Sequence, residues 1–572
     1  MLVQGDINFR YNLTYFYVIM IGEKVINTYI FSTGSKRRTR MKINKIGAIL
    51  CASALILSNT FAFGDTIDSM STFIKNGKIV TYSDFTEEDD FKKIVPIDHQ
   101  FNEYQNFAHG YTIKYPNHMY VDVSISPVKT LIYDKEKSIE IYYDNFKGTS
   151  SSAASYIGYS NRFLQNTKDH YKEYEDTLHI NGMKVHLLKW DRDKLPKVHN
   201  DKNHYVSAEI VKNAHEVYTI IIKSAKPFQS YEEYMELIQT FMLIEKKGTP
   251  QVHLEQGKVY RGLNDETKAF YEKYFENSKE IQWGIFENTA PKDFGFLKSL
   301  EEQLDYTFDF LVLYQSFSSN GFPMEEMNNA YENNRYVELT LQTMYLDGRD
   351  NDSVTYDILK GKYDDYFYEY ARQAKLFEHP ILFRLNNEMN GDWCVYSSYF
   401  TSKDPEMFKA VWKYVYNIFK DAGVDNVLWV WNPHDGSFPN FAWNHSLNYY
   451  PGDEYVDIIG LTGYNAGTYY PGETWRGFNE IYVPLYEEYD KIFRQPFMVT
   501  EFGSNSVGGN KIEWIHEMFD QMKKFERIKV AIWWNGIDWD SQRNPARIYR
   551  LDQSPEMINT FRHRLKEYKT TE

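Results

Sequence analysis

The sequence is poor in cysteine and has fewer basic residues (64) than acidic ones (79), and both features exclude classes of protein. Its 572 residues include only two cysteines, Cys51 and Cys394. Cys51 lies in a predicted leader, so the mature chain keeps one cysteine and no internal disulfide, which fits Gram-positive-type secretion. The net charge of −15 argues against binding to nucleic acid or to an anionic membrane.

The apolar run near the N-terminus, at 46–57, is too short to span a bilayer as a helix. A basic segment precedes this run and small residues follow it, which is typical of a secretory signal cleaved after Ala62. Residues 1–62 are therefore predicted to be leader and signal peptide. The true start is then Met41, and residues 1–40 are an upstream translation artefact or an unusual extension. We expect a secreted or cell-surface protein with no membrane insertion after cleavage.

Aromatic residues are abundant, at 17% of the chain, with 48 tyrosines and 12 tryptophans. Many of these rings must belong to the hydrophobic core. Such an excess also suits a protein that stacks aromatic rings on flat apolar faces, including the faces of sugars.

Periodicity divides the mature chain into two domains. Residues 63–248 show several short strand patterns, with helical patterns at 153–165 and 231–243. This mixture predicts a smaller N-terminal α+β accessory domain that ends in a linker. A packing or attachment role is favoured there over carbohydrate binding, because no carboxylate pair, metal cluster or phosphate loop stands out.

Residues 255–572 show a different pattern, in which strands alternate with amphipathic helices. Eight strand-like runs occur, at 281–286, 308–314, 337–343, 381–386, 427–431, 456–462, 497–500 and 530–534. This is the count of a (β/α)8 TIM barrel, a fold of the α/β class. A doubly wound open sheet is the alternative, but it would need a phosphate-binding glycine loop after its first strand, and none follows.

Two glutamates, Glu388 and Glu501, each stand at the end of a strand-like apolar run, on predicted strands four and seven. A carboxylate in such a place is costly unless it points into a functional cleft. In an eight-stranded barrel these two strands face each other across the mouth, where active sites lie. Repulsion between the carboxylates lets one hold its proton, which gives the acid and the nucleophile or base that cleavage of a glycosidic bond requires.

The segments around these glutamates resemble glycoside hydrolase family 26. They are RLNNEMNGDW at 384–393, FKAVW at 408–412, VLWVWNP at 427–433 and TEFG at 500–503. The resemblance covers about 255–560 and implies a retaining β-glycosidase of clan A, with Glu388 as acid/base and Glu501 as nucleophile. Double displacement by two glutamates needs no metal and no organic cofactor.

Asn387 departs from the pattern of family 26 mannanases, which usually carry histidine immediately before the acid/base. Asparagine is commoner there across the clan, as in family 5 cellulases, where it contacts the sugar 2-hydroxyl. Glucose and mannose differ in the orientation of that hydroxyl, so the sequence favours an endo-β-1,4-glucanase acting on cellulose-type or mixed-linkage glucan.

Three alternatives remain open. The first is an endo-β-1,4-mannanase, the second a non-catalytic polysaccharide-binding protein, and the third a cell-surface assembly protein whose α+β domain is the active part. The expected partner is a β-1,4-linked glycan, with exopolysaccharide synthesis machinery as a further candidate. The sequence does not distinguish trimming of the producer's own polymer from digestion of a foreign one.

Other residues receive supporting roles by position and resemblance. Arg384 lies in step with Glu388 on strand four and is expected to orient Glu501, unless it forms a structural salt bridge. Tyr464 follows strand six, and its hydroxyl is expected to donate to the nucleophile. Trp533 resembles the platform under the sugar at the cleavage point, whereas Trp534 is expected to point into the core.

Several aromatic residues are predicted on the rim of the barrel, either lining an extended groove or buried in the core: Trp393, Trp431, Trp443 and Trp475. His434 follows strand five and is expected to contact substrate or Glu388, unless it is a surface histidine. An acidic run with Asp347, Asp350 and Asp352 lacks the glycine and terminal glutamate of a calcium loop. It is therefore predicted to be a solvated turn, and no metal site is expected.

Overall fold

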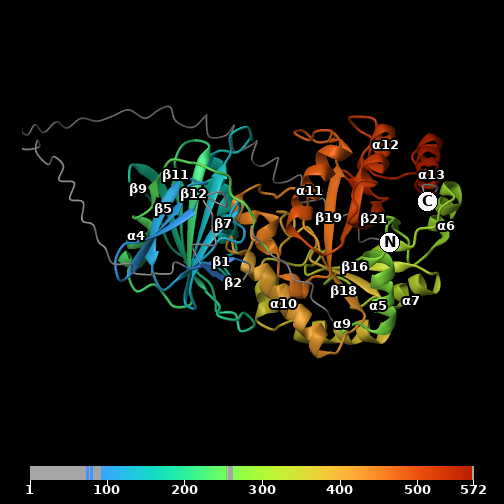
Figure 1. Cartoon of the computed structure of the whole chain (residues 1–572). Coiled ribbons are helices and arrows are strands. Elements are labelled where there is room, and N and C mark those ends of the chain that lie inside the picture. The colour runs from blue at the N-terminus through green and yellow to red at the C-terminus, as the bar shows by residue number, and fades with distance from the viewer. Residues whose placement is uncertain (1–71, 76–77, 82–91, 253, 255–261, 570–572) are drawn as a thin grey trace, which may run out of the picture. The chain divides into compact units, whose positions relative to one another are not determined.

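The computed structural model describes residues 72–75, 78–81, 92–252, 254 and 262–569. The predicted leader over 1–62, with its start at Met41, lies outside these residues. Figure 1 shows the N-terminal domain in blue to green and the barrel from green to red. Within the described residues, no helix combines the length and the apolar character needed to cross a membrane.

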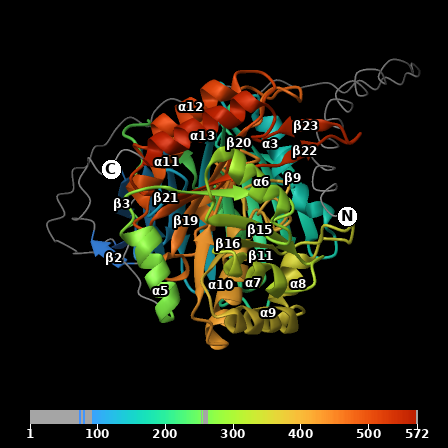
Figure 2. The same cartoon turned by 90° about the vertical axis from the view of Figure 1, so that its right-hand side faces the viewer.

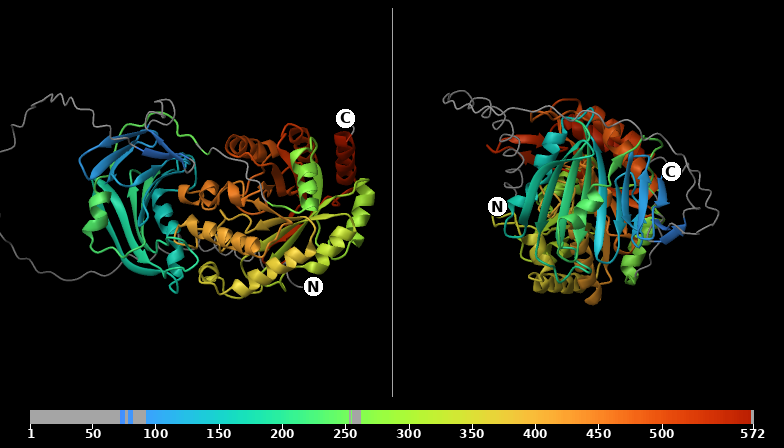
Figure 3. Two further views of the ribbon diagram at one scale, coloured as in Figure 1. Left: turned by 60° about the horizontal axis from the view of Figure 1, so that its bottom comes forward. Right: turned by 90° about the vertical axis from the view of Figure 1, so that its left-hand side faces the viewer.

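The N-terminal domain is built on two mainly antiparallel sheets, and its long strands are seen in Figure 3. The larger sheet has the order β2-β1-β6-β7-β8-β12-β11-β10-β9, and the smaller has the order β13-β5-β4-β3. Their bounds are β1 Thr72–Lys75, β2 Lys78–Thr81, β3 Lys92–Pro96, β4 Phe101–Asn106, β5 Tyr111–Pro116, β6 Tyr120–Asp122, β7 Lys129–Tyr133, β8 Lys137–Asn145, β9 Tyr171–Ile180, β10 Met183–Asp191, β11 His204–Val211, β12 Glu216–Ser224 and β13 Met242–Leu243.

Two short helices accompany these sheets, α3 (Ala153–Ser160) and α4 (Glu232–Ile238). Helix α4 packs with both sheets around one apolar core, to which Ile113, Ile220 and Ile238 contribute fully buried side chains. The structure thus contains the smaller sheet-rich domain that the sequence predicted before the barrel.

The C-terminal part is a closed barrel of eight parallel strands in sequence order, as predicted. These strands are β14 Gln282–Phe286, β15 Phe310–Ser316, β16 Tyr336–Gln342, β17 Ile381–Leu385, β18 Val427–Trp431, β19 Ile458–Asn465, β20 Phe497–Ser504 and β21 Ile528–Trp534. A small hairpin, β22 Ile537–Trp539 with β23 Pro545–Ile548, follows the last strand.

Helices surround the strands, as Figure 2 shows. They are α5 Asp265–Tyr271, α6 Gly295–Leu304, α7 Met324–Glu332, α8 Val354–Leu359, α9 Asp364–Phe377, α10 Pro405–Asp421, α11 Phe478–Ile492, α12 Lys511–Met522 and α13 Pro555–Lys569. Helix α10 illustrates their design, because its Asp404 N-cap accepts from Glu406 N, proline stands in the first turn, and one face is apolar.

The barrel strands are apolar on both faces, since one face fills the barrel and the other packs against helices. On β17, Leu382 belongs to the interior cluster, whereas the neighbouring Phe383 belongs to the outer one. On β21, Val530 and Ile532 face the interior and Ala531 faces the helices. This alternation decides which side chains of a strand can reach the mouth of the barrel.

The N-terminal domain and the barrel form one compact unit and share buried polar contacts. Lys403 of the barrel is fully buried, and its Nζ lies 2.6 Å from Glu209 Oε1 on β11. Lys223 on β12 pairs with Asp404 at 2.7 Å. Buried charges are costly unless they are paired, so these pairs stabilise the contact between the two domains.

Candidate active site

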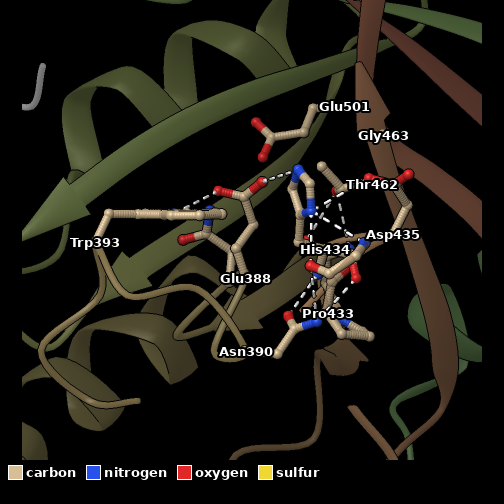
Figure 4. A network of polar contacts seen from close by, with 12 residues as sticks. Glu388, Asn390, Trp393, Pro433, His434, Asp435, Thr462, Gly463 and Glu501 are labelled. Atoms are coloured by element: carbon tan, nitrogen blue, oxygen red, sulfur yellow. Dashed lines mark hydrogen bonds and ion pairs between the residues drawn. The ribbon is translucent and has the colours of Figure 1, made fainter. Parts of the chain in front are cut away.

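Glu388 and Glu501 meet at the mouth of the barrel, and Figure 4 shows their carboxyl groups pointing toward one another. Glu388 follows the end of β17, and Glu501 lies within β20. The side chain of Glu388 is 16% exposed and that of Glu501 is 5% exposed. The two carboxyl groups that the sequence singled out therefore lie in one site, in unequal surroundings.

The backbone leaves β17 through an unusual conformation that directs Glu388. Asn386 and Glu388 both have a φ of 53°, in the left-handed region that non-glycine residues seldom occupy. The Asn386 side chain accepts from Thr343 N at 2.8 Å, and Glu388 N donates to Asn432 O at 2.8 Å. These contacts hold the strained turn in place.

Two aromatic residues contact the Glu388 carboxyl group. Trp393 Nε1 donates to Glu388 Oε2 at 3.2 Å, and His434 Nε2 lies 3.9 Å from Oε1 (Figure 4). The two rings meet edge to face, with centroids 5.4 Å apart. The expected contact between His434 and Glu388 is thus present, and Trp393 lies at the site rather than in the core.

Glu501 reaches the mouth because strand β20 is irregular. Leu461 on β19 pairs with Val499, but the next residue, Thr462, pairs with Glu501, so Thr500 is an extra residue. Such a bulge redirects side chains at an active site. The Thr500 hydroxyl lies 2.8 Å from that of Thr462 inside the barrel.

Glu501 combines burial with two contacts that favour its ionised form. Burial raises the pKa of Glu501 to about 8, and the Asp538 carboxylate adds to the increase. The Arg384 guanidinium, 3.3 Å from Oε1, and the hydroxyl of Tyr314, which donates to Oε2, favour the ionised form instead. Both oxygens of Glu501 are therefore contacted by groups that stabilise negative charge.

Arg384 is fully buried between two carboxyl groups. Its Nε lies 2.5 Å from Glu338 Oε1, and its Nη1 lies 3.3 Å from Glu501 Oε1. The same side chain donates to Thr340 Oγ1 at 2.7 Å and to Asn432 Oδ1 at 3.0 Å. The two expectations for Arg384, orienting Glu501 and forming a structural salt bridge, are thus both met by its contacts.

Asn387 is held in place by hydrogen bonds that its side-chain and backbone oxygens accept. Its Oδ1 accepts from Gln342 Nε2 at 3.1 Å, and its backbone carbonyl accepts from the Tyr396 hydroxyl at 2.8 Å. Because the side-chain oxygen is engaged with Gln342, the orientation of the amide group is fixed beside Glu388.

The tyrosine that donates to Glu501 is Tyr314 on β15, which the sequence analysis did not select. Tyr464, proposed for this contact, instead packs edge-on against Trp534 at 6.2 Å and lies 5.0 Å from Tyr549. Burial raises the pKa of Tyr464 and the Glu388 carboxylate adds to the increase, so this residue is nevertheless near the site. The alternation of β15 indicates this orientation, because Tyr314 lies on the same inward face of the strand as Phe310 and Val312.

The assignments of Trp533 and Trp534 are reversed in the structure. Trp533 is fully buried among the outer helices, and its Nε1 donates to Tyr549 O at 2.9 Å. Trp534 is partly buried, packs with the interior cluster and stacks on Phe286 at 5.1 Å. The prediction of Trp533 as a platform is therefore wrong, because the inward parity of β21 runs through Val530 and Ile532 to Trp534.

Two of the four rim tryptophans are also core residues. Trp431 is fully buried between the strands and helices, and fully buried Trp443 donates to Ser160 Oγ in the N-terminal domain. The ring of Trp475 covers Gly509, where an added Cβ would lie 2.4 Å from it. Trp475 is partly buried, and its place in a substrate groove stays a prediction.

The acidic run pairs with basic side chains rather than converging. Asp347 contacts Arg349 at 2.6 Å, and Asp350 contacts Lys168 at 2.6 Å. Across the described parts of the chain, no three His, Cys, Asp or Glu side chains gather as a set of metal ligands.

Part of the barrel is similar to proteins of a known family. Residues 337–532 match the family model of Glycosyl hydrolase family 26. Endoglucanase H of Acetivibrio thermocellus is 31% identical over 212 residues, which are 36% of this chain and 22% of that protein. A mannan endo-1,4-beta-mannosidase of Bacillus subtilis is 26% identical over 236 residues, which are 40% of this chain and 54% of that protein.

These curated relatives are matched over a fifth to about half of their own length. Among solved structures, a modular endo-beta-1,4-mannanase of Cellulomonas fimi aligns with a TM-score of 0.42 and 16% identity, over 53% of this chain and 74% of that one. Residues 337–532 of the barrel are similar to Glycosyl hydrolase family 26, the family that the motifs of the sequence resemble.

Proposed function

We propose that this protein is a secreted, retaining endo-β-1,4-glycanase that hydrolyses a polysaccharide by double displacement. The observation that supports this proposal is a pair of facing glutamates, one partly exposed and one buried (Figure 4). Glu388 is partly exposed and contacted by an indole N–H, whereas Glu501 is buried between a guanidinium group and a hydroxyl group. These surroundings support a role in proton exchange for Glu388 and a role in attack for Glu501.

In the first step Glu388 donates its proton to the leaving glycosidic oxygen while a Glu501 oxygen attacks the anomeric carbon. The C–O bond to the leaving sugar breaks, and a glycosyl ester forms on Glu501. In the second step the Glu388 carboxylate removes a proton from water, and this water hydrolyses the ester with retention of configuration. Arg384 and Tyr314 stabilise the charge that returns to Glu501.

β-1,4-Glucan is the favoured substrate, because Asn387 stands beside the acid/base and its amide is fixed by Gln342. A fixed amide supports the proposed contact with the sugar 2-hydroxyl, the group whose orientation distinguishes glucose from mannose. The relative named endoglucanase H supports this choice. The relatives named mannan endo-1,4-beta-mannosidase keep a mannanase as the second candidate.

The deciding experiment measures reducing ends released from carboxymethylcellulose, mixed-linkage glucan and mannan. Wild type is expected to release sugar from a glucan, and Glu501→Gln to release none while still binding the polymer. Release of reducing ends from mannan alone would make mannan, not β-1,4-glucan, the substrate. Binding without release by wild type would favour the non-catalytic polysaccharide-binding alternative, and failure to bind or cleave any β-glycan would refute the proposal.

The stereochemical course and the location are tested separately. NMR of the first product should show the β-anomer, and an initial α-anomer would contradict a retaining mechanism. N-terminal sequencing of protein recovered from the medium should begin at Phe63, directly after the predicted cleavage site. Retention of the protein inside the cells would contradict the proposed export.

A further inference from the structure

The loop that carries Glu388 contacts the N-terminal domain through Tyr159, on the last turn of helix α3. Its hydroxyl donates to Asp392 Oδ2, four residues after Glu388. Its ring stacks on that of Tyr399, with centroids 4.9 Å apart. Helix α3 is itself fixed by a capping box at Ser152.

Asp392 is coupled to the acid/base through its neighbour in the chain. Trp393 folds back over Gly391 so closely that a Cβ on Gly391 would lie 2.4 Å from the ring. From this position Trp393 Nε1 donates to Glu388 Oε2 at 3.2 Å. A displacement of Asp392 would therefore move the indole that contacts the carboxyl group.

A second route links the same helix to the other side of the loop. Ser160 Oγ, at the end of α3, accepts from Trp443 Nε1 at 3.2 Å. The next residue, Asn444, donates its amide to Asn390 O at 2.8 Å. The end of helix α3 thus supports the turn after Glu388 from two directions.

The Tyr159 contact matters because Asp392 is partly buried. Burial raises the pKa of Asp392, and the hydrogen bond from Tyr159 opposes this increase. A buried carboxyl group that loses its donor must find another partner or move toward water. Either response would change the position of the segment between Asp392 and Glu388.

We propose that Tyr159 of the N-terminal domain is a positioning residue for Glu388, acting through Asp392 and Trp393. The N-terminal domain then belongs to the active unit, because it holds the proton donor of the barrel in place. This inference rests on the proposed function, in which Glu388 is the acid/base.

The test compares Tyr159→Phe with Tyr156→Phe. Tyr156 lies on the same helix, and its buried hydroxyl contacts Thr219 Oγ1 at 2.6 Å within the N-terminal domain, so it controls for the loss of a buried hydroxyl. Both variants are assayed on the polysaccharide and on a dinitrophenyl β-glycoside of the same sugar. The dinitrophenolate leaving group departs with little help from a proton, whereas the polysaccharide needs the acid.

Tyr159→Phe is expected to lower kcat/KM on the polysaccharide about tenfold, a part of the 10²–10⁴-fold that a positioned acid contributes. On the dinitrophenyl substrate the loss should stay below about twofold, and Tyr156→Phe should change neither rate. Asp392→Ala should reproduce the pattern, and the double variant should lose no more than either single one. Equal losses on both substrates, or no loss, would overturn the inference.

Hydrogen exchange of the amides in 388–394 provides a readout that does not need activity. Exchange there should be faster in Tyr159→Phe than in Tyr156→Phe. If wild type cleaves no β-glycoside, the proposed function fails, and the exchange comparison alone decides whether Tyr159 holds the loop. Unchanged hydrogen exchange in Tyr159→Phe would refute the claim that Tyr159 holds the loop, whether or not the enzyme is active.

Discussion

Replacement of Tyr314 by phenylalanine removes one of the two groups that favour the ionised form of Glu501. Attack requires that ionised form, and burial already raises the pKa of Glu501 to about 8. The Tyr314 hydroxyl donates to Oε2, and no other atom of the ring is changed by the substitution. The variant therefore isolates one hydrogen bond to the nucleophile.

The size of the effect follows from the charge on the acceptor. A hydrogen bond to a charged group contributes about 1.5–3 kcal/mol, and one pKa unit corresponds to about 1.4 kcal/mol. Loss of the donor should thus raise the pKa of Glu501 by about one to two units. Since activity is lost as the pH falls through this pKa, the acidic limb of the kcat/KM profile should move to higher pH by that amount.

The assay is the pH dependence of kcat/KM on a soluble β-glycan, which reports ionisations of the free enzyme. Tyr464→Phe is the matched control, because this tyrosine packs against Trp534 and Tyr549 at the same mouth. Its acidic limb should stay where it is in wild type. An unmoved limb in Tyr314→Phe, or an equal shift in Tyr464→Phe, would refute the assignment of Tyr314 as the donor.

Three further predictions concern the same site. Trp533→Ala should lower the free energy of unfolding by about 3–5 kcal/mol because the ring is fully buried, whereas Trp534→Ala should chiefly lower kcat/KM. Denaturant unfolding measures the first effect and steady-state kinetics the second. The reverse result would support the sequence prediction that Trp533 is the platform. Glu338→Gln removes the carboxylate 2.5 Å from Arg384, so more of the guanidinium charge acts on Glu501, and the acidic limb should move to lower pH, opposite to Tyr314→Phe. Burial raises the Glu501 pKa from 4.5 to about 8, so wild type loses stability as the pH rises through this range and the buried carboxyl group ionises. Glu501→Gln cannot ionise, so its Tm should exceed that of wild type by more at pH 8.5 than at pH 4. An equal Tm difference at the two pH values would contradict the raised pKa.

The eight barrel strands were predictable because parallel strands buried on both faces are continuous apolar runs. Each predicted run overlaps one observed strand, and the differences are confined to the ends. Strand β9 of the N-terminal domain is hard to recognise in the sequence for the opposite reason. It is a largely exposed edge strand with the charged sequence YKEYEDTLHI, which protects the edge of a sheet but hides the strand from a search for alternation.

The sequence predicted side-chain positions poorly where the backbone departs from a regular strand and where many residues of one type compete for a role. The bulge at Thr500 breaks the period of two just before Glu501, and sequence alternation does not reveal it. The donor to Glu501 comes from one of 48 tyrosines, so position after a strand could not select Tyr314 over Tyr464. The exchange of Trp533 and Trp534 was avoidable, since Val530 and Ile532 fix the inward parity.

The different tasks that we propose for two chemically identical side chains follow from how the chain places them. Glu388 follows the end of β17 in a turn with left-handed residues, so its carboxyl group keeps contact with the open mouth, at 16% exposure. An acid that must later act as a base needs this access, because it exchanges protons with the leaving group and with water. Glu501 stays within β20 and is redirected by a bulge, so its carboxyl group is 5% exposed and meets Arg384 inside the barrel. A nucleophile gains from that shielding, since attack strips water from its oxygens in any case. The division of labour thus begins with the backbone, and the neighbouring side chains reinforce it.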